Sequence, residues 1–426
     1  MNKVKLGLFG VVTALVGQSA SATNGYLALG YGAVSVGQAG ACVAITDSAM
    51  CAANNPAVLT SIDNRWELGV DLFMPDRGFK ANDNAMTPPY PSIPPGKYES
   101  ENDWFLIPNF AYNRRLDDTT ALGLIVGGQG GMNVEYDSAV FRNFNNPGGV
   151  ASSTTSMDLA QLFIGLDYAK RLNDQHTLAV MPVFAVQSLK VKGLQPFQPW
   201  SESPDKVTNN GRDWSYGGGV RVGWLWDANE ALKIGASYQT KLWMSRFDDY
   251  KGLMAEGGDF DVPPILDLGF SYRFHPQWRF AFNYQFIQYE AINSVSNSAD
   301  LVFPIPPQPL LGTDGGLGFG WDNMHVYKFG LSWDYKPDLT FRAGYSHATD
   351  AFENTQALFN ILAPAVVKDH FTFGVGKKLS PQSEINLAVM YAPEEKVSGT
   401  NPNTGPQTGY LYMDQWQISL GWTFKL

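Results

Sequence analysis

Alternation of apolar with polar or small residues recurs along the chain from Trp66 onward, and it constrains the fold more than any other feature. From Leu266 to Phe274, every second side chain is apolar, and those between are Asp, Gly, Ser and Arg. Period-two alternation places the two kinds of side chain on opposite faces of a β-strand. Fourteen such strands are predicted, at 66–74, 103–115, 119–130, 157–171, 176–192, 212–226, 231–247, 262–274, 278–291, 323–335, 339–348, 369–379, 383–394 and 410–426.

The connections between these strands are alternately short and long. The short ones are tight polar turns such as Leu116–Asp118. The long ones lie at 75–102, 131–156, 193–211, 248–261, 292–322, 349–368 and 395–409. Short turns at one end and long loops at the other are typical of an outer-membrane barrel. A soluble β-sandwich needs no such asymmetry. We therefore predict an all-β fold, a transmembrane antiparallel β-barrel of about 14 strands spanning residues 64–426.

The first 22 residues have the pattern of a secretory signal peptide. Lys3 and Lys5 precede a short apolar stretch at 6–16, and Ala20–Ala22 offers a small-residue cleavage site. The predicted mature chain begins at Thr23 and is exported to the bacterial outer membrane. The formal net charge of −10 argues against a nucleic-acid partner.

Residues 23–63 lack the alternation and are rich in Gly and Ala, so we predict that they form a plug inside the barrel. This segment holds both cysteines, Cys42 and Cys51. In an oxidising compartment a disulfide between them is the favoured interpretation, and two small buried residues are the alternative. Positions nine apart lie on opposite sides of a continuous helix, so a disulfide requires a break, for which Thr46–Ser48 is a plausible cap or turn.

Basic residues are plentiful on the predicted lumen face. They are Arg221, Lys233, Lys241, Arg273, Arg279, Lys328 and Arg342. Pairing with acids such as Asp167, Asp267 and Asp334 is their ordinary role. The alternative is that one or two receive the carboxylate of an amphipathic substrate. Arg342 and Lys328 are the first choices, because they should lie on neighbouring strands, and Lys241, Arg221 and Arg279 are further candidates.

The long loops carry apolar clusters that a water-filled porin would not need. The candidate substrate-binding residues among them are Phe197, Trp200, Phe303, Ile305, Leu358, Phe359 and Ile361. Exposed apolar clusters often mark binding sites. Packing of these residues on one another, or over the barrel mouth, explains them equally well.

A run of glycines ends the third predicted strand, at Gly127, Gly128, Gly130 and Gly131. Glycine in a strand often marks a bulge or bend. A loop start is the plain interpretation, and a kink that opens the wall sideways is the functional one. The five histidines show no metal-ligand spacing and no catalytic motif is present, so neither an enzyme, a metal nor a cofactor is predicted.

Three short motifs of the plug resemble the N-terminal hatch of the FadL/TodX family of outer-membrane transporters of hydrophobic compounds. They are Gly40–Ala44, Asp47–Ala49 and Asn55–Ala57. The segments 235–241 and 341–345 are similar to two strands of that family, although Gln239 replaces the usual Arg. The Cys42/Cys51 pair is not a general family feature.

The resemblance implies a plugged fourteen-stranded barrel that captures hydrophobic molecules at the outer loops and passes them to a lumen site. Movement of a hatch containing Asn55, Pro56 and Ala57, together with the kink at the glycine run, would then release substrate sideways. We expect passive uptake by a monomer in contact with outer-membrane lipid and lipopolysaccharide. Long-chain fatty acids are the leading substrates. Uptake of aromatic hydrocarbons or alkanes, a general porin, and an adhesin or structural barrel are the alternatives.

Overall fold

The computed structural model describes residues 23–83, 92–144, 153–299, 309–400 and 407–426, with the side chains of Leu358, Phe359 and Thr400 left out. Its strands are β1 Arg65–Ala81, β2 Gly96–Glu99, β3 Phe105–Arg115, β4 Thr120–Tyr136, β5 Thr155–Arg171, β6 His176–Lys192, β7 Asp213–Asp227, β8 Leu232–Gln239, β9 Trp243–Met244, β10 Ile265–His275, β11 Trp278–Ile287, β12 Met324–Lys336, β13 Leu339–Ala348, β14 Asp369–Lys378, β15 Ser383–Thr400 and β16 Thr408–Lys425.

The helical elements are short. They are α2 Gly32–Val36, α3 Ala255–Gly258, α4 Asn293–Ser296 and α5 Ala357–Asn360, and the 3₁₀ turns η1 Ala49–Ala53, η2 Pro56–Ser61, η3 Gln195–Trp200, η4 Pro204–Lys206, η5 Asp248–Tyr250, η6 Tyr289–Ala291 and η7 Asn354–Gln356. Within the described ranges, no helix is long and apolar enough to cross a membrane.

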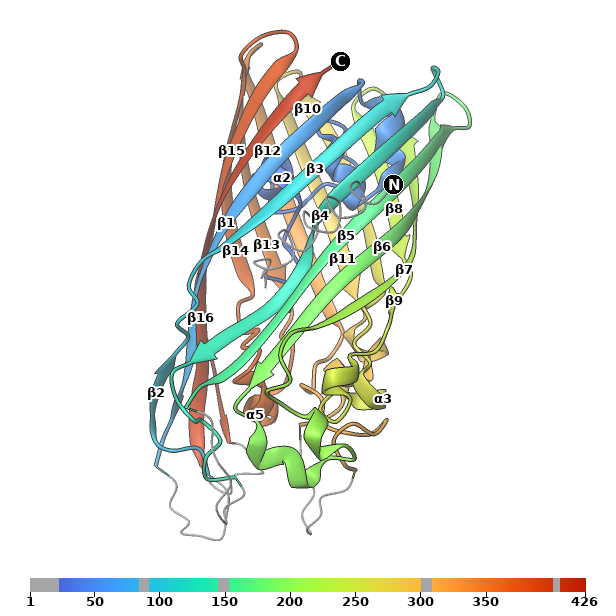
Figure 1. The fold of residues 1–426 in the computed structure, drawn as a ribbon. Coiled ribbons are helices and arrows are strands. Elements are labelled where there is room, and N and C mark those ends of the chain that lie inside the picture. Colours follow the sequence, from blue (N-terminus) through green and yellow to red (C-terminus); the bar gives the residue numbers. More distant parts are fainter. Residues whose placement is uncertain (1–22, 84–91, 145–152, 300–308, 401–406) are drawn as a thin grey trace, which may run out of the picture.

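The strands form one closed antiparallel barrel (Figure 1). Consecutive long strands are hydrogen-bonded neighbours around the wall, and β16 pairs with β1 from Arg65–Lys425 to Ala81–Gly409. The short strands β2 and β9 lie off this circuit, so 16 strands less 2 leave the 14 that were predicted. The fold prediction is confirmed.

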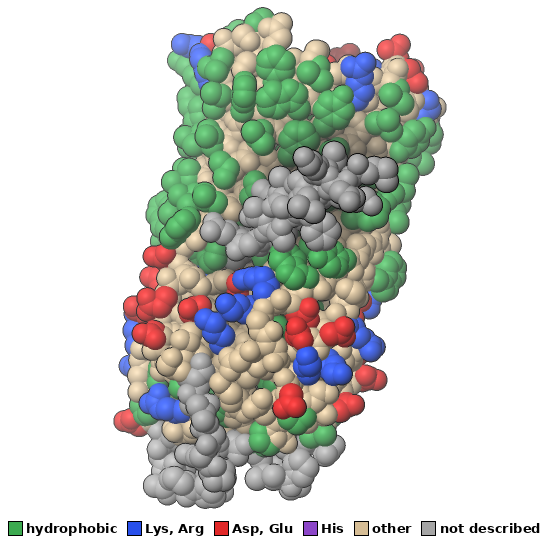
Figure 2. All heavy atoms as spheres, in the orientation of Figure 1, with side chains coloured by type: hydrophobic (Ala, Val, Ile, Leu, Met, Phe, Trp, Pro, Cys, Tyr) green, Lys and Arg blue, Asp and Glu red, His purple; other side chains and the backbone are tan. Residues whose placement is uncertain are grey.

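Side chains alternate between the two faces of the wall as the sequence pattern requires. On β16, Trp416, Ile418 and Leu420 are exposed, whereas Gln417 and Ser419 are buried toward the lumen. Figure 2 shows hydrophobic side chains over the upper part of one face and charged side chains below them. The apolar band is the surface that meets lipid in a transmembrane barrel.

Several predicted strand limits differ from those observed: for example, β15 continues to Thr400 beyond the predicted 394, and β11 ends at Ile287 before the predicted 291. β1 continues to Ala81, and β4 runs through the glycine run to Tyr136 because a bulge between Gly128 and Gly130 preserves its pairing with β5. The predicted strand 231–247 ends at Gln239. Beyond Gln239 the strand is interrupted: Leu242 pairs with Val262 of the following loop, and Trp243–Met244 resumes the pairing with β7 as β9.

Residues Thr23–Ile62 lie inside the barrel and form the plug (Figure 1, blue), near the end where the C-terminus lies. The plug contains α2, η1 and η2. A disulfide joins Cys42 to Cys51, and the residues between Val43 and Ser48 are not helical. The plug therefore folds back on itself at the segment that contains Asp47.

Glycines in the wall let the plug backbone approach closely. A Cβ placed on Gly235 of β8 would lie 2.3 Å from the Val43 carbonyl oxygen, and one on Gly223 of β7 would lie 2.2 Å from the Asn55 side-chain oxygen. These distances are shorter than any van der Waals contact, so a larger residue at either position must displace the plug.

We predict that Gly235→Ala displaces the plug at a cost of about 1–3 kcal/mol from overpacking. The plug segment should then become more susceptible to protease in the folded barrel. Gly421→Ala on β16 is the matched control, because its Cβ would meet nothing closer than Ala33 at 3.5 Å. Equal protease resistance of the two variants would contradict the close fit at Gly235.

Candidate functional site

The barrel wall has a gap between β3 and β4. These strands pair only from Phe110–Val126 to Arg115–Ala121. Beyond this point Phe105–Asn109 pairs with β1, and Gly127–Met132 pairs with β5, but among the described residues the two segments do not pair with each other. Pro108, which has no N–H to donate, lies in the unpaired part of β3. We call this opening the wall gap.

The plug covers the lumen side of the wall gap with its own backbone. The Ala28 N–H donates to the Gln129 carbonyl at 3.2 Å, and the Gly131 N–H donates to the Tyr26 carbonyl at 2.9 Å. A Cβ on Gly130 would lie 2.1 Å from the same carbonyl oxygen. The glycine run therefore forms the bulge that the sequence suggested and also accepts the plug as a short neighbouring strand.

An aromatic cluster holds the plug segment that covers the wall gap. The Tyr289 hydroxyl donates to the Asn24 carbonyl at 2.6 Å and accepts from the Tyr26 N–H at 3.3 Å. The Tyr26 ring lies 5.3 Å from that of Tyr289 and 5.9 Å from that of Trp321. Burial raises the pKa of both tyrosine hydroxyls, so Tyr289 remains a neutral hydrogen-bond donor.

A pocket adjoins the wall gap on the lumen side and has about 350 Å³ of empty space, including the part open to solvent. We call it the gap pocket. Most of its surface is apolar or aromatic. Its lining residues are Gly25, Phe73, Pro75, Arg77, Phe105, Gly131, Met132, Asn133, Trp321, Ala363, Pro364, Ala365 and Met413. The pocket thus touches the plug at Gly25 and both edges of the wall gap.

Three of the predicted lumen cations contact the plug. The Lys328 ammonium donates to the Leu29 carbonyl at 2.9 Å, and the Arg221 guanidinium donates to the Asn54 carbonyl at 2.9 Å. Arg279 forms a two-pronged ion pair with Asp47. Desolvation of the half-buried Asp47 carboxyl opposes its ionisation, but the nearby Arg279 outweighs it and holds the Asp47 pKa well below its usual range.

The other predicted lumen cations have partners in the wall or loops. Arg342 donates to the Asn386 side chain at 2.9 Å, and Lys241 pairs with Asp261 at 3.0 Å. Lys233 pairs with Asp227, and Arg273 pairs with Asp334.

Arg342 and Lys328 lie on adjacent strands, as expected, but at different heights. In the pairing of β12 with β13, Lys328 lies opposite Ser346, and Arg342 lies opposite Ser332. The structure therefore does not bring the two cations together. A substrate-binding role for them stays a prediction.

The predicted loop residues do not converge on one site. Phe197 and Trp200 are buried, and Phe197 packs on Phe141 and Phe144 with ring centres 5.1 and 5.5 Å apart. Ile361 lines a second apolar pocket, open to solvent, beside Tyr410 and Leu411. Phe303 and Ile305 lie outside the described residues, as do the side chains of Leu358 and Phe359.

The motif residues Asn55, Pro56 and Ala57 form the start of η2. The Asn55 side-chain oxygen accepts from the Ala57 N–H at 3.1 Å, and Pro56 occupies the first turn, where no N–H is needed. The Asn55 amide also donates to the carbonyls of Val43 and Trp224. Asn55 therefore joins the two halves of the plug to β7.

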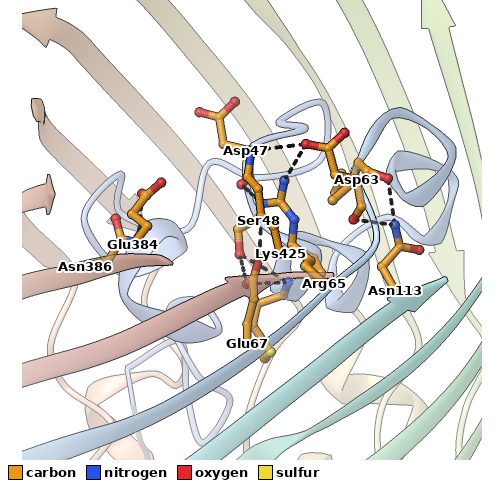
Figure 3. Close-up of polar contacts among 12 residues, drawn as sticks. Asp47, Ser48, Asp63, Arg65, Glu67, Asn113, Glu384, Asn386 and Lys425 are labelled. Carbon is orange, nitrogen blue, oxygen red and sulfur yellow. Dashed lines mark hydrogen bonds and ion pairs between the residues drawn. The ribbon is translucent and has the colours of Figure 1, made fainter. Parts of the chain in front are cut away.

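Glu67 of β1 anchors the start of η1. Its carboxylate accepts from the Ser48 hydroxyl at 2.5 Å and from the Ala49 N–H at 2.8 Å (Figure 3). Arg65 donates to the Asp47 carbonyl from the next lumen-facing position of the same strand. Neither Arg65 nor Glu67 was singled out from the sequence. The inward position of Glu67 on the predicted strand 66–74 was its only signal, and Arg65 lies just before that predicted strand.

No group of three or more His, Cys, Asp or Glu side chains suited to a metal ion occurs in the described part of the chain. The site is built from backbone amides, buried ion pairs and an apolar pocket. Such an arrangement can bind and release an apolar molecule.

We predict that Glu67→Gln loosens the plug, because a neutral amide replaces the charged acceptor of the η1 start. Hydrogen bonds of this buried kind contribute about 1–3 kcal/mol. In planar bilayers the variant should show more frequent ion-conducting openings than the wild type. Glu384→Gln on β15 is the control, since Glu384 bonds to Asn386 and not to the plug. Identical conductance of both variants and the wild type would contradict the anchoring role.

A closed barrel with an internal plug and an interrupted wall is the fold of an outer-membrane transport channel. The chain matches the family described as "Outer membrane protein transport protein (OMPP1/FadL/TodX)" over residues 13–424. It therefore belongs to this family of transporters of hydrophobic compounds, which is a family of transport channels and not of enzymes. The protein is integral to the outer membrane.

Solved structures share the fold at low sequence identity. The Pseudomonas putida toluene transporter TodX is 20% identical with a TM-score of 0.68, covering 93% of this chain and 99% of that one. A Pseudomonas aeruginosa FadL homologue is 16% identical with a TM-score of 0.69, covering 94% and 99%. The Ralstonia pickettii toluene transporter TbuX is 17% identical with a TM-score of 0.66, covering 93% and 99%. No curated protein matches the chain.

Proposed function

We propose that the protein takes up hydrophobic molecules across the outer membrane without an energy source, and that long-chain fatty acids are its main substrates. The observation that carries this proposal is the gap pocket, which adjoins both the plug and the wall gap. A molecule bound there needs to displace only the plug segment Tyr26–Ala28 to reach the opening. Its apolar part would then enter lipid without crossing water.

The outer loops supply the first step of the proposed route. Ile361 and its neighbours form an apolar pocket at the outer rim, where a ligand arrives from outside. The proposed order is capture at the outer loops, transfer to the gap pocket, and exit through the wall gap. We propose that the protein acts as a monomer surrounded by outer-membrane lipid and lipopolysaccharide. Carboxylate recognition by Arg342 and Lys328 stays a prediction.

Aromatic hydrocarbons are the second candidate substrates. The aromatic lining of the gap pocket by Phe73, Phe105 and Trp321 suits a small ring compound. Two structures with the same fold are those of toluene transporters. Uptake of labelled oleate and labelled toluene by a deletion strain, with and without the gene restored, separates the two candidates. Uptake of neither compound by the restored strain would overturn the proposed function.

A general porin is disfavoured, because the plug fills the lumen with buried side chains such as Val43 and Leu59. A porin would show a large and steady conductance in planar bilayers. We expect the wild-type protein to show none.

We predict that locking the wall gap blocks transport. A Cβ on Gly128 would lie 2.7 Å from the Ile107 side chain across the gap, so the pair Ile107→Cys and Gly128→Cys is placed to form a disulfide. Uptake should fall below about a tenth of the wild-type rate and recover on reduction, because the exit is a gating step.

Two controls accompany the locked variant. The pair Tyr112→Cys and Leu124→Cys crosses β3 and β4 where they are already paired and should transport normally. Wild-type protein treated with the same reductant accounts for any effect on the Cys42–Cys51 disulfide. Undiminished uptake by the oxidised Ile107/Gly128 variant would refute the lateral route.

A further inference from the structure

The gap pocket contains a buried arginine that has no acidic partner among the described residues. Arg77 lies on the lumen face of β1, is only 3% exposed and lines the pocket. In the described part of the chain, Asp76 and Asp103 act on Arg77 only as distant charges and form no ion pair with it. Arg221, Arg279 and Lys241, by contrast, each pair with an aspartate.

Neutral oxygens hold the Arg77 guanidinium in place. Its Nε donates to the Asn133 carbonyl at 2.7 Å, and its Nη1 donates to the carbonyls of Pro75 at 2.9 Å and Asn102 at 2.7 Å. Its Nη2 donates to the Asn133 side-chain oxygen at 3.3 Å. An arginine has five N–H donors, so these four bonds leave one N–H of Nη2 for another acceptor.

The charge of Arg77 is therefore fixed in position but not neutralised by an anion. Burial of a charge without a counter-charge is costly, and carbonyl dipoles offset only part of that cost. An anion that enters the pocket would supply the missing charge and accept a charge-assisted hydrogen bond. The Phe105 ring, centred 5.6 Å from the guanidinium carbon, keeps water from one side of it.

The remainder of the pocket suits an apolar tail. Phe73, Met132, Trp321 and Met413 line it beyond the guanidinium. We infer that the gap pocket binds amphipathic carboxylates, with the head group at Arg77 and the tail against these side chains, and that Arg77 is the residue that selects them over neutral molecules. This inference rests on the proposed uptake function and narrows its substrate class.

Arg77 is also placed to detect a ligand at the exit. By donating to Asn133 it links β1 to β4 across the outer end of the wall gap, past β3. A carboxylate that accepts the remaining N–H of Nη2 shares that nitrogen with the Asn133 side-chain oxygen. A purely structural link would instead affect charged and neutral ligands alike, and this difference can be measured.

The test compares decanoate with 1-decanol, which have matched tails and differ in the head group. Dissociation constants are measured for purified wild-type protein, Arg77→Gln and Arg77→Lys. We expect the wild type to prefer decanoate, and Arg77→Gln to weaken decanoate binding at least about tenfold while leaving decanol binding unchanged. Arg77→Lys keeps the charge and should retain part of the preference.

Two further variants make the result decisive. Arg115→Gln removes a cation at the far end of β3 and should change neither constant. Arg342→Gln tests the rival carboxylate ligand predicted from the sequence. The inference is overturned if Arg77→Gln weakens both ligands equally, if the wild type shows no preference, or if the preference depends on Arg342 alone.

Failure of the inference can be told apart from failure of the proposed function. Wild-type protein that transports decanol and toluene but shows no preference for decanoate would retain the proposed function and lose only the role of Arg77. Wild-type protein that takes up none of the three compounds would lose the proposed function itself. If Arg77→Gln does not fold, Arg77→Lys provides the comparison. Weaker binding of both ligands by this variant, with an unchanged ratio of decanoate to decanol affinity, would mean that Arg77 is only a structural link and would overturn the inference.

Discussion

Backbone hydrogen bonding at the wall gap is the constraint on which the rest of the structure depends. A barrel in lipid must satisfy every backbone N–H and C=O within the protein, because hydrocarbon offers no partners. The separation of β3 from β4 beyond Val126 breaks that rule locally. The plug repairs it from inside, through the bonds of Ala28 and Gly131, and Arg77 repairs it at the outer end. The wall gap is therefore closed by hydrogen bonds from the plug and from Arg77, which a bound ligand can replace.

The plug is held differently on the two sides of its disulfide. After Cys42, the anchors are charged or polar groups of the barrel wall, including Arg279 on Asp47, Glu67 on Ser48 and Arg221 on Asn54. Before Cys42, the segment that covers the wall gap is held by Tyr289 and by two backbone bonds to β4, and Lys328 donates to the Leu29 carbonyl just after it. The Arg279–Asp47 ion pair thus lies in the part after Cys42, and the Cys42–Cys51 bond lies within that same part.

The strand pattern was predictable because period-two alternation and turn length are local properties of the sequence. All fourteen strands follow from it, and so does the bulge at the glycine run. The position where β3 and β4 stop pairing was not predictable from the sequence. It depends on how each strand pairs with its other neighbour, and that pairing joins segments distant in sequence. The glycine run at 127–131 is a local sign of a kink in the wall and Pro108 is a second one, but neither is specific for strands that separate.

The site residues were harder to identify for the same reason. Alternation placed Arg221, Arg279, Lys328 and Arg342 on the lumen face correctly, but it could not say that the first three meet the plug, because those contacts depend on how the plug folds. Arg77 is not among the predicted site residues because it lies in the part of β1 for which the sequence predicts a loop, 75–102. Phe197 packs on Phe141 and Phe144, and Trp200 packs on Phe197, so these apolar residues join two loops that are distant in sequence.

Ligand-dependent hydrogen exchange at the Gly131 amide tests the central claim most directly, because this N–H bonds to Tyr26 of the plug. Exchange is compared in the purified protein with and without decanoate. The account predicts faster exchange of Gly131 and Ala28 when ligand is bound, with no change in the paired amides of β4 and β5 below Val126. Unchanged exchange at Gly131 and Ala28 under saturating ligand would contradict the claim that the plug segment Tyr26–Ala28 moves away from the wall gap when substrate binds.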